Sequence, residues 1–379
     1  MVSFFTDFAS SLVMPILPVF IVLVLDQGVD KLGAVLAITT LVSYALRFVG
    51  GALSDKYQTN KRFLILGYGL SALAKPFLGI TDSWQGVAVV RSSEHLGKAL
   101  RAAPKDKLIT QSANKEKMGS SVGLHKAIEK FGELLGLAVL LTTVIYFGTS
   151  ETVIRNLFTL SAIPGLLAIL VLCVFVKEQR GGKSKKKPTF RFELESNARK
   201  PIFAYASLSL FMFGESFYLL IGNQMGLELT AVLSIYILSR ALQIWVSLKA
   251  GKTLDNMSVR TLLVVGYLAG LSSLLLLFVN QLGTFAIAFI LLGVYDVIML
   301  NSLRSYIGKH AIDKGATFGA LYFIVAIVSA IGAYGLSLVW QHYGVNSALF
   351  TATLGILLSG GFIAWLLHVS SLLNKPNKL

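Results

Sequence analysis

The chain contains few charged residues and almost no cysteine. Asp, Glu, Lys and Arg make up 14% of its 379 residues, against roughly 25% in an ordinary soluble domain. Its single cysteine, Cys173, lies in an apolar run, which excludes an internal disulfide and leaves the redox compartment undefined. Hydrophobic residues make up 55% of the chain, and the mean hydropathy is +0.71. This composition excludes an ordinary soluble protein and predicts a polytopic membrane protein.

The sequence also lacks the motifs of common enzyme sites. No P-loop, metal-binding Cys/His spacing, nucleophile elbow or dinucleotide glycine pattern lies in a loop large enough to hold such a site. We therefore expect no enzyme activity, no cofactor and no metal. The formal net charge is +15, but the basic residues lie in short connectors rather than on one solvated face, so nucleic acid is not an expected partner. The first apolar run follows no basic n-region, and we expect it to be retained.

Long apolar runs fill the chain. Runs such as Phe8–Leu25 and Leu349–Leu367 approach the ~20 residues that a helix needs to cross ~30 Å of hydrocarbon. Bounded by Gly, Pro, Asn or charge, these runs predict twelve transmembrane helices. The predicted helices lie near 3–25, 32–53, 63–80, 85–107, 119–146, 154–176, 201–222, 227–249, 260–279, 283–305, 316–340 and 346–370.

Lys and Arg residues fall almost entirely in alternate gaps between these helices. They gather after helices 2, 4, 6, 8 and 10 and in the C-terminal tail, whereas only Lys31 and Arg155 lie in the other gaps. The positive-inside rule then places both termini in the cytoplasm. We expect an integral protein of a bacterial inner membrane, embedded in the lipid bilayer as a monomer.

The longest connector divides the predicted helices into six and six. We predict an N-terminal bundle over 1–176, a basic cytoplasmic linker over 177–200 and a C-terminal bundle over 201–379. Short segments recur at an offset of roughly 200 residues, which indicates duplication. Gly51 to Asp55 recurs in spacing as Gly251 to Asp255, and Phe5-Thr6-Asp7 is echoed by Phe213-Gly214-Glu215.

These segments resemble the major facilitator superfamily over essentially the whole chain. Gly51-Ala52-Leu53-Ser54-Asp55-Lys56 is similar to the family's signature loop between helices 2 and 3, although Gln58 stands where the family usually has Gly. Arg91 and Gly97 have the spacing of a second motif. Gly132 and Gly136 resemble the antiporter motif, but Leu137 replaces its Pro. The stretch 95–136 is also similar to generic bacterial members of the superfamily.

The resemblance implies an all-α membrane fold of two pseudo-symmetric six-helix bundles, with helices 1, 4, 7 and 10 around a central cavity. It also implies loops that lock one access state. The residues expected in these loops and their contacts are Gly51, Asp55, Lys56, Arg101, Gly251 and Asp255.

Ionisable residues within the predicted spans are the main functional candidates. A charge at the bilayer centre costs roughly 2.5–3.5 kcal/mol, so such groups pair or face a cavity. Acids lie in helices 1, 4, 7 and 10, in agreement with the implied cavity. A carboxylate in a changing cavity can load a proton on one side and release it on the other. The predicted proton carriers are Asp7, Glu94, Glu129 and Glu215.

Helices 4 and 5 are predicted to share an ion-pair network. Arg91, Glu94, His95 and Lys98 follow i, i+3, i+4 and i+7 on one face of helix 4. Because the two helices run in opposite directions, we expect Arg91 near Glu133, and Glu94 with His95 near Glu129 and Lys130. We expect Lys75 to reach the membrane interface.

Basic, aromatic and acidic side chains near these acids are candidates for substrate contacts. They are Arg47, Arg91, His95, Lys126, Lys130, Tyr218, Tyr236, Arg240, Tyr295 and Asp296.

The sequence favours a secondary transporter that uses alternating access and the proton gradient to move a small polar or charged solute. Multidrug efflux by proton antiport is an alternative, weakened by Leu137. Another is an uncoupled facilitator or lipid-handling protein in which the buried charges only hold helices together.

Overall fold

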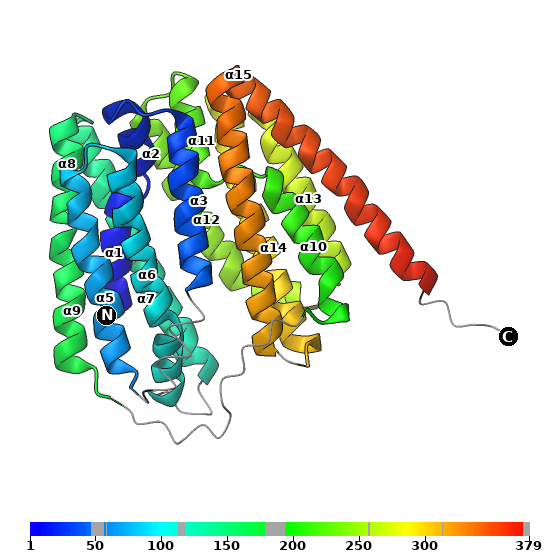
Figure 1. The fold of residues 1–379 in the computed structure, drawn as a ribbon, viewed down its shortest axis with the longest axis horizontal. Helices are drawn as coiled ribbons and strands as arrows, with labels where there is room; N and C mark the ends of the chain where they lie inside the picture. Colours follow the sequence, from blue (N-terminus) through cyan, green and yellow to red (C-terminus); the bar gives the residue numbers. More distant parts are fainter. Residues whose placement is uncertain are drawn as a thin grey trace. The chain divides into compact units, whose positions relative to one another are not determined.

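The computed structural model describes residues 1–46, 57, 59–112, 118–178, 194–256, 258–312 and 314–373. These residues form helices and connecting turns, with no strand among them. The chain forms two compact units, Met1–Phe190 and Arg191–Leu379, and each is described by itself (Figure 1). The predicted all-helical class is confirmed for the described part of the chain.

The first unit contains the helices of the N-terminal half. They are α1 (Val2–Val13), α2 (Leu17–Val19), the π-helix η1 (Phe20–Val24), α3 (Val29–Ala45), α5 (Lys61–Ala74), the 3₁₀ helix η2 (Lys75–Ile80), α6 (Trp84–Ser112), α7 (Met118–Phe147), α8 (Glu151–Leu160) and α9 (Ala162–Phe175).

The second unit begins inside the predicted linker, with a helix that starts at Ser196. Its helices are α10 (Ser196–Phe211), α11 (Glu215–Gln224), α12 (Leu229–Asn256), α13 (Val259–Leu276), α14 (Leu282–His310) and α15 (Lys314–Leu373).

Eight stretches of these helices are long and apolar enough to cross a membrane. Several features keep the count below twelve; one is that α13 counts only as a shorter apolar helix, over Arg260–Leu276. The stretch over Ala316–Trp365 includes both arms of α15, which meet at Gly344, where φ is +84°. The charged helix α6 is not among the eight, because Arg, Lys and Glu interrupt its apolar run. The structure therefore supports a polytopic membrane protein, and the count of twelve crossings stays a prediction.

The same packing pattern occurs in both units. In the first unit α1 packs on α7, α5 on α6, and α3 on α6. In the second unit α10 packs on α15, α13 on α14, and α12 on α14. In chain order these are equivalent pairs of helices. The internal packing of the two units therefore agrees with the duplication inferred from sequence spacing.

Glycines permit the closest of these helix contacts. A Cβ atom added at Gly132 of α7 would lie 2.4 Å from the Phe4 carbonyl oxygen of α1. A Cβ added at Gly332 of α15 would lie 2.1 Å from the Leu210 carbonyl oxygen of α10. Small residues let helix backbones approach closely in membranes. The glycine pattern that resembles an antiporter motif thus has a packing role here.

The first helical stretch of each unit is broken. In the first unit α1 ends at Val13, and Pro15 and Pro18 follow, so backbone N–H donors are missing where a continuous helix would need them. In the second unit α10 ends at Phe211, and α11 starts at Glu215 with Gly214 as an extended N-cap. The acid Glu215 therefore lies at a helix N-terminus, where the helix dipole favours negative charge.

Candidate functional site

The first charged cluster surrounds Glu94 on α6. Glu94 is fully buried and accepts a hydrogen bond from Arg91 one turn earlier. Lys98 Nζ, one turn later, lies 2.8 Å from Glu94 Oε1. The helical spacing thus places these side chains on one face, as predicted from the sequence. One carboxylate serves more than one cation here, so the cluster carries excess positive charge.

Lys75 completes this cluster, which corrects the expectation that it reaches the membrane interface. Its side chain is 1% exposed, and Nζ lies 3.9 Å from Glu94 Oε1 and 3.5 Å from Ser71 Oγ. Its position follows from the tight packing of α5 on α6, where a Cβ at Gly67 would lie 2.6 Å from the Gly97 carbonyl oxygen. The sequence alone could not show that Lys75, at the start of η2, faces α6.

His95 lies beside the cluster in an uncharged form. Arg91 Nη2 lies 3.1 Å from His95 Nε2, and because arginine only donates, Nε2 must be the acceptor. The ring proton then belongs to Nδ1, a buried atom with no hydrogen-bond partner in the described part of the chain. His95 is therefore a neutral acceptor for Arg91 in this arrangement.

A second polar network connects four helices of the first unit. Glu129 of α7 pairs with Lys105 Nζ of α6 at 2.7 Å and with His125 Nε2 at 3.0 Å. His125 Nε2 also lies 3.4 Å from Ser3 Oγ of α1, which lies 3.2 Å from the Tyr68 hydroxyl of α5. Sequence reasoning missed Ser3, Tyr68 and Lys105, since a lone hydroxyl or a cation near a helix end carries no distinctive pattern.

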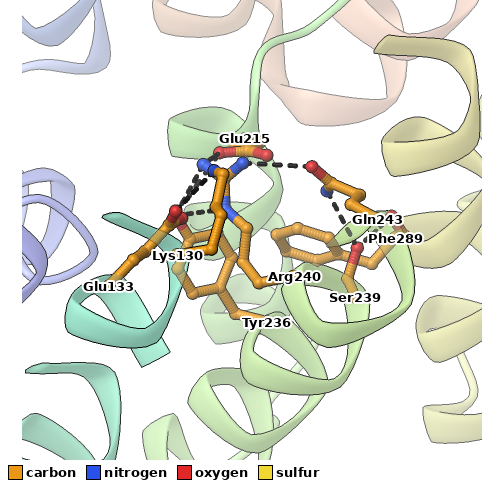
Figure 2. A network of polar contacts seen from close by, with 8 residues as sticks. All are labelled: Lys130, Glu133, Glu215, Tyr236, Ser239, Arg240, Gln243 and Phe289. Carbon is orange, nitrogen blue, oxygen red and sulfur yellow. Dashed lines mark hydrogen bonds and ion pairs between the residues drawn. The ribbon is translucent and has the colours of Figure 1, made fainter. Parts of the chain in front are cut away.

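The predicted ion pairs of Glu94 and His95 with Glu129 and Lys130 are wrong for the described residues. Glu94 pairs with Lys75 of η2 and with Arg91 of α6. Lys130 Nζ instead pairs with Glu133 Oε2 at 2.6 Å (Figure 2). The physical reason is that α7 packs chiefly on α1. Helices adjacent in sequence need not be packing partners along their length.

Asp7 lies on α1, partly buried, among charges from two other helices. Its charged neighbours are Glu129 of α7 and Lys98, Arg101 and Lys105 of α6. Within the described part of the chain its carboxylate makes no ion pair. Asp7 is thus close to the second network without being tied into it.

Basic side chains line a cavity of about 270 Å³ in the first unit. Lys98, Arg101 and Lys105 reach it from α6, and Lys126 reaches it from α7. Arg101 was expected to contact a locking loop. It is 8% exposed, and its guanidinium stacks on the Tyr68 ring with Cζ 4.2 Å from the ring centroid.

In the second unit, a partly buried ion pair joins α11 and α12. Arg240 Nη2 donates to Glu215 Oε2 at 2.5 Å, and the Tyr236 hydroxyl lies 3.4 Å from the same oxygen (Figure 2). Arg240 also donates to the Tyr236 hydroxyl at 3.0 Å and to Gln243 Oε1 at 3.1 Å. Gln243 in turn donates to Ser239 Oγ at 3.4 Å. The structure therefore brings together three predicted site residues: Glu215, Tyr236 and Arg240.

Asp296 of α14 lies within electrostatic range of Glu215 and Arg240. The two predicted tyrosines nearby have packing contacts. The Tyr218 hydroxyl lies 2.6 Å from Ser273 Oγ in the interior of the unit, and the buried Tyr295 ring lies against Gly270 of α13.

The remaining predicted positions fall outside what the structure describes. Arg47, Gly51, Asp55 and Lys56 lie outside the described residues. Gly251 and Asp255 lie in α12, which continues through the expected loop to Asn256, but their side chains lie outside the described part.

These sites offer ion pairing, hydrogen bonding and proton exchange. Among the described residues, no group of three or more His, Cys, Asp or Glu side chains could hold a metal ion. The charged groups instead lie on several helices within each unit. Such intramembrane groups mark solute or ion pathways.

A family model and two other proteins match this sequence. The family model of the Major Facilitator Superfamily matches residues 1–333. An uncharacterized MFS-type transporter of Methanocaldococcus jannaschii is 26% identical over 369 residues, which cover 94% of this chain and 90% of that protein. A stretch of 141 residues is 28% identical to an uncharacterized protein of Mycobacterium bovis and covers 37% of this chain and 34% of that protein.

Solved transporter structures share the fold at low identity. A mutant of the nucleoside transporter NupG has a TM-score of 0.79 at 12% identity, covering 99% of this chain and 98% of that one. A POT family transporter in complex with a thioalcohol-conjugated peptide has a TM-score of 0.77 at 13% identity, covering 99% and 95%. A bacterial homologue of the human lysosomal transporter Spinster has a TM-score of 0.76 at 11% identity, covering 100% and 97%.

Proposed function

The chain belongs to the Major Facilitator Superfamily, and we propose that it is a proton-coupled secondary active transporter that moves a small polar or charged solute by alternating access. Proteins of this family are membrane transporters rather than enzymes. We further propose twelve crossings in two bundles, a monomer, an inner-membrane location and cytoplasmic termini. The alternation of basic connectors in the sequence supports this orientation.

The placement of Asp7 is the observation that carries the proposal of proton coupling. A carrier must both bind and release its proton as its surroundings change. Glu94 does not suit this role, because three cations hold it as a carboxylate. Asp7 makes no ion pair among the described residues, yet it lies near Glu129 and three cations. It can therefore exchange a proton without first breaking an ion pair.

Glu129 and Glu215 are candidates for a second role. Each is paired in this structure, Glu129 with Lys105 and Glu215 with Arg240. Each must lose its cation before it can take up a proton, so protonation would accompany a change of partner. We assign these two acids to coupling between protonation and conformational change, and Asp7 to proton carriage.

The helix breaks support alternating access. The first helical stretch of each unit is interrupted, after Val13 in one and between Phe211 and Glu215 in the other. Discontinuous helices near charged groups are typical of transporter binding regions. Such breaks let one end of a helix move while the other remains packed.

The test begins with a thermal-shift screen of metabolites and drugs at an acidic and a neutral pH, since a ligand that binds the folded state stabilises it. A stabilising ligand is then used in proteoliposomes with an imposed proton gradient. D7N should abolish gradient-driven accumulation and retain solute exchange at equal pH on both sides. E228Q, which alters an exposed acid, is the matched control.

The proposal of proton coupling fails if the gradient dependence is unchanged in D7N, E94Q, E129Q and E215Q. Flux that ignores the proton gradient in the unmodified protein would instead favour an uncoupled facilitator. The ion pairs of the fully buried Glu94 would also suit a facilitator, because paired charges can simply hold helices together.

A further inference from the structure

The basic cavity of the first unit contains no acid among its described lining residues. Its volume is about 270 Å³, and four of its side chains are cationic: Lys98, Arg101, Lys105 and Lys126. Ser43 of α3 adds a hydroxyl group. Sites for drug-sized ligands are typically about 300–1,000 Å³, so the space suits a small solute. A positively charged lining favours a negatively charged one.

Existing partners neutralise only part of this charge. Lys105 pairs with Glu129 at 2.7 Å, and Lys98 pairs with Glu94 at 2.8 Å. Glu94, however, also serves two other cations. Arg101 and Lys126 make no ion pair within the described part of the chain. The cavity therefore retains positive charge that is not tied up in ion pairs among the described residues.

Arg101 is the best placed of the four to bind an anion. Its side chain is more than nine-tenths buried, and the Tyr68 ring covers one face of the guanidinium. Its Nη1 atom is buried and has no hydrogen-bond partner among the residues that the structure describes. A buried donor without an acceptor is costly. An anionic ligand in the cavity would supply that acceptor, and the rigid fork of arginine suits a carboxylate or phosphate.

The surrounding charges strengthen this argument. Among the described side chains, six cations gather in this part of the first unit against three carboxylates. The cations are Lys75, Arg91, Lys98, Arg101, Lys105 and Lys126, and the carboxylates are Asp7, Glu94 and Glu129. An imbalance of this kind is expensive in a membrane interior. A bound anion lowers that cost, so the charge around the cavity favours the binding of an anion.

We propose that this cavity binds the anionic group of the transported solute, a carboxylate or phosphate held by Arg101 with Lys98, Lys105 and Lys126. The solute is thus a small organic or inorganic anion. This assignment rests on the proposed transport function and narrows its substrate class. The same chemistry could be offered by an anionic lipid headgroup, and the experiment separates the two sources.

The test uses the purified full-length protein in neutral detergent at constant ionic strength. Its thermal unfolding is followed during titration with inorganic phosphate and with succinate. Neutral succinamide and cationic putrescine are the controls, and phosphatidylglycerol is added in a separate arm. We expect saturable stabilisation by at least one soluble anion and none by succinamide or putrescine.

Variants then locate the site. R101Q should raise the half-saturating anion concentration about tenfold or more, because a charge-assisted donor is lost. R101K, which keeps the charge but loses the fork, should fall between R101Q and the unmodified protein. R260Q removes an exposed arginine of the second unit and should have no effect. If R101Q fails to fold, K126Q provides the same comparison at an exposed position.

Three outcomes overturn the assignment. The first is no stabilisation by phosphate or succinate. The second is an anion affinity in R101Q and K126Q equal to that of the unmodified protein. The third is stabilisation by phosphatidylglycerol alone. Anion binding through Arg101 without any solute flux in proteoliposomes would uphold the site and refute the proposed function. Proton-driven flux of a neutral or cationic solute would uphold the proposed function and refute the assignment of the anionic solute.

Discussion

Replacing Glu94 with glutamine should destabilise the protein strongly, because it removes a buried carboxylate that pairs with three cations. Glutamine keeps the size and shape of the side chain, so packing is preserved. Of the three cations, Lys98 is 29% exposed and can turn toward water. The side chains of Arg91 and Lys75 are 3% and 1% exposed. Neither can reach water unless the helices separate.

The magnitude follows from this burial. Removing one partner of a buried ion pair costs about 3–5 kcal/mol, and we expect E94Q to lower the free energy of unfolding by that amount. Lys75 is the most weakly held cation, since its Nζ lies 3.9 Å from Glu94 Oε1. K75M alone should therefore change stability by less than about 1 kcal/mol, because an apolar replacement removes its own desolvation cost.

The double variant E94Q/K75M tests the reasoning. It should be more stable than E94Q by about 1–3 kcal/mol, since one of the two stranded cations is gone. Equilibrium unfolding in mixed micelles of neutral detergent and dodecyl sulfate, followed by tryptophan fluorescence, gives the three differences. E228Q controls for loss of an exposed carboxylate. Additive effects in the double variant, or a cost of E94Q below about 1 kcal/mol, would refute the cluster as a structural unit.

Two further predictions concern packing and connections between helices. G132A should lower the free energy of unfolding by about 1–3 kcal/mol, because its Cβ would lie 2.4 Å from the Phe4 carbonyl oxygen, whereas G69A on α5 meets nothing within 4 Å and should not destabilise. Arg155 donates to Glu151, to Asp82 and to the Gly79 and Thr81 carbonyls at 2.7–3.0 Å. R155K should cost about 1–2 kcal/mol in the same unfolding assay, since one ammonium group cannot reach all four acceptors. An R155K variant as stable as the unmodified protein would contradict this account.

Much of the fold could be predicted because its signals are local. Apolar runs of bilayer length, bounded by Pro, Gly and charge, fix where helices form, and the structure retains them as helices. The 3.6-residue period also placed Arg91, Glu94 and Lys98 on one face of α6 without any knowledge of neighbours. Each of these inferences concerns a single helix.

Contacts between helices were harder to predict. The sequence could not show that Lys75, the first residue of η2, lies buried against α6, where α5 approaches α6 closely at Gly67 and Gly97. It likewise predicted that Glu94 and His95 of α6 pair with α7, whereas α7 packs chiefly on α1 and its Glu129 pairs with Lys105, further along α6. The choice of packing partner depends on which helix faces fit closely. In the sequence, a glycine such as Gly132 carries no signal that identifies the helix it contacts.

The balance of charges around the cavity could not be predicted from the sequence, because it also depends on contacts between helices. A count of interior charges over the whole chain gives nearly equal numbers of acids and bases. In the sequence, Arg101 and Lys105 fall near the cytoplasmic end of the predicted helix 85–107. The structure instead separates the charges by unit. The first unit gathers cations around its cavity, whereas in the second Arg240 lies with Glu215 and near Asp296.

The two units therefore share a scaffold but differ in chemistry. Packing of α1 on α7 and of α10 on α15 uses glycine against a backbone carbonyl in both, at Gly132 and at Gly332. Such contacts depend on shape and tolerate few changes. Charged side chains project from the same scaffold and can change without altering it, so function is decided by them rather than by the fold. For this reason we base the proposed solute class on the cations beside Arg101, and not on the solutes of transporters that merely share the fold.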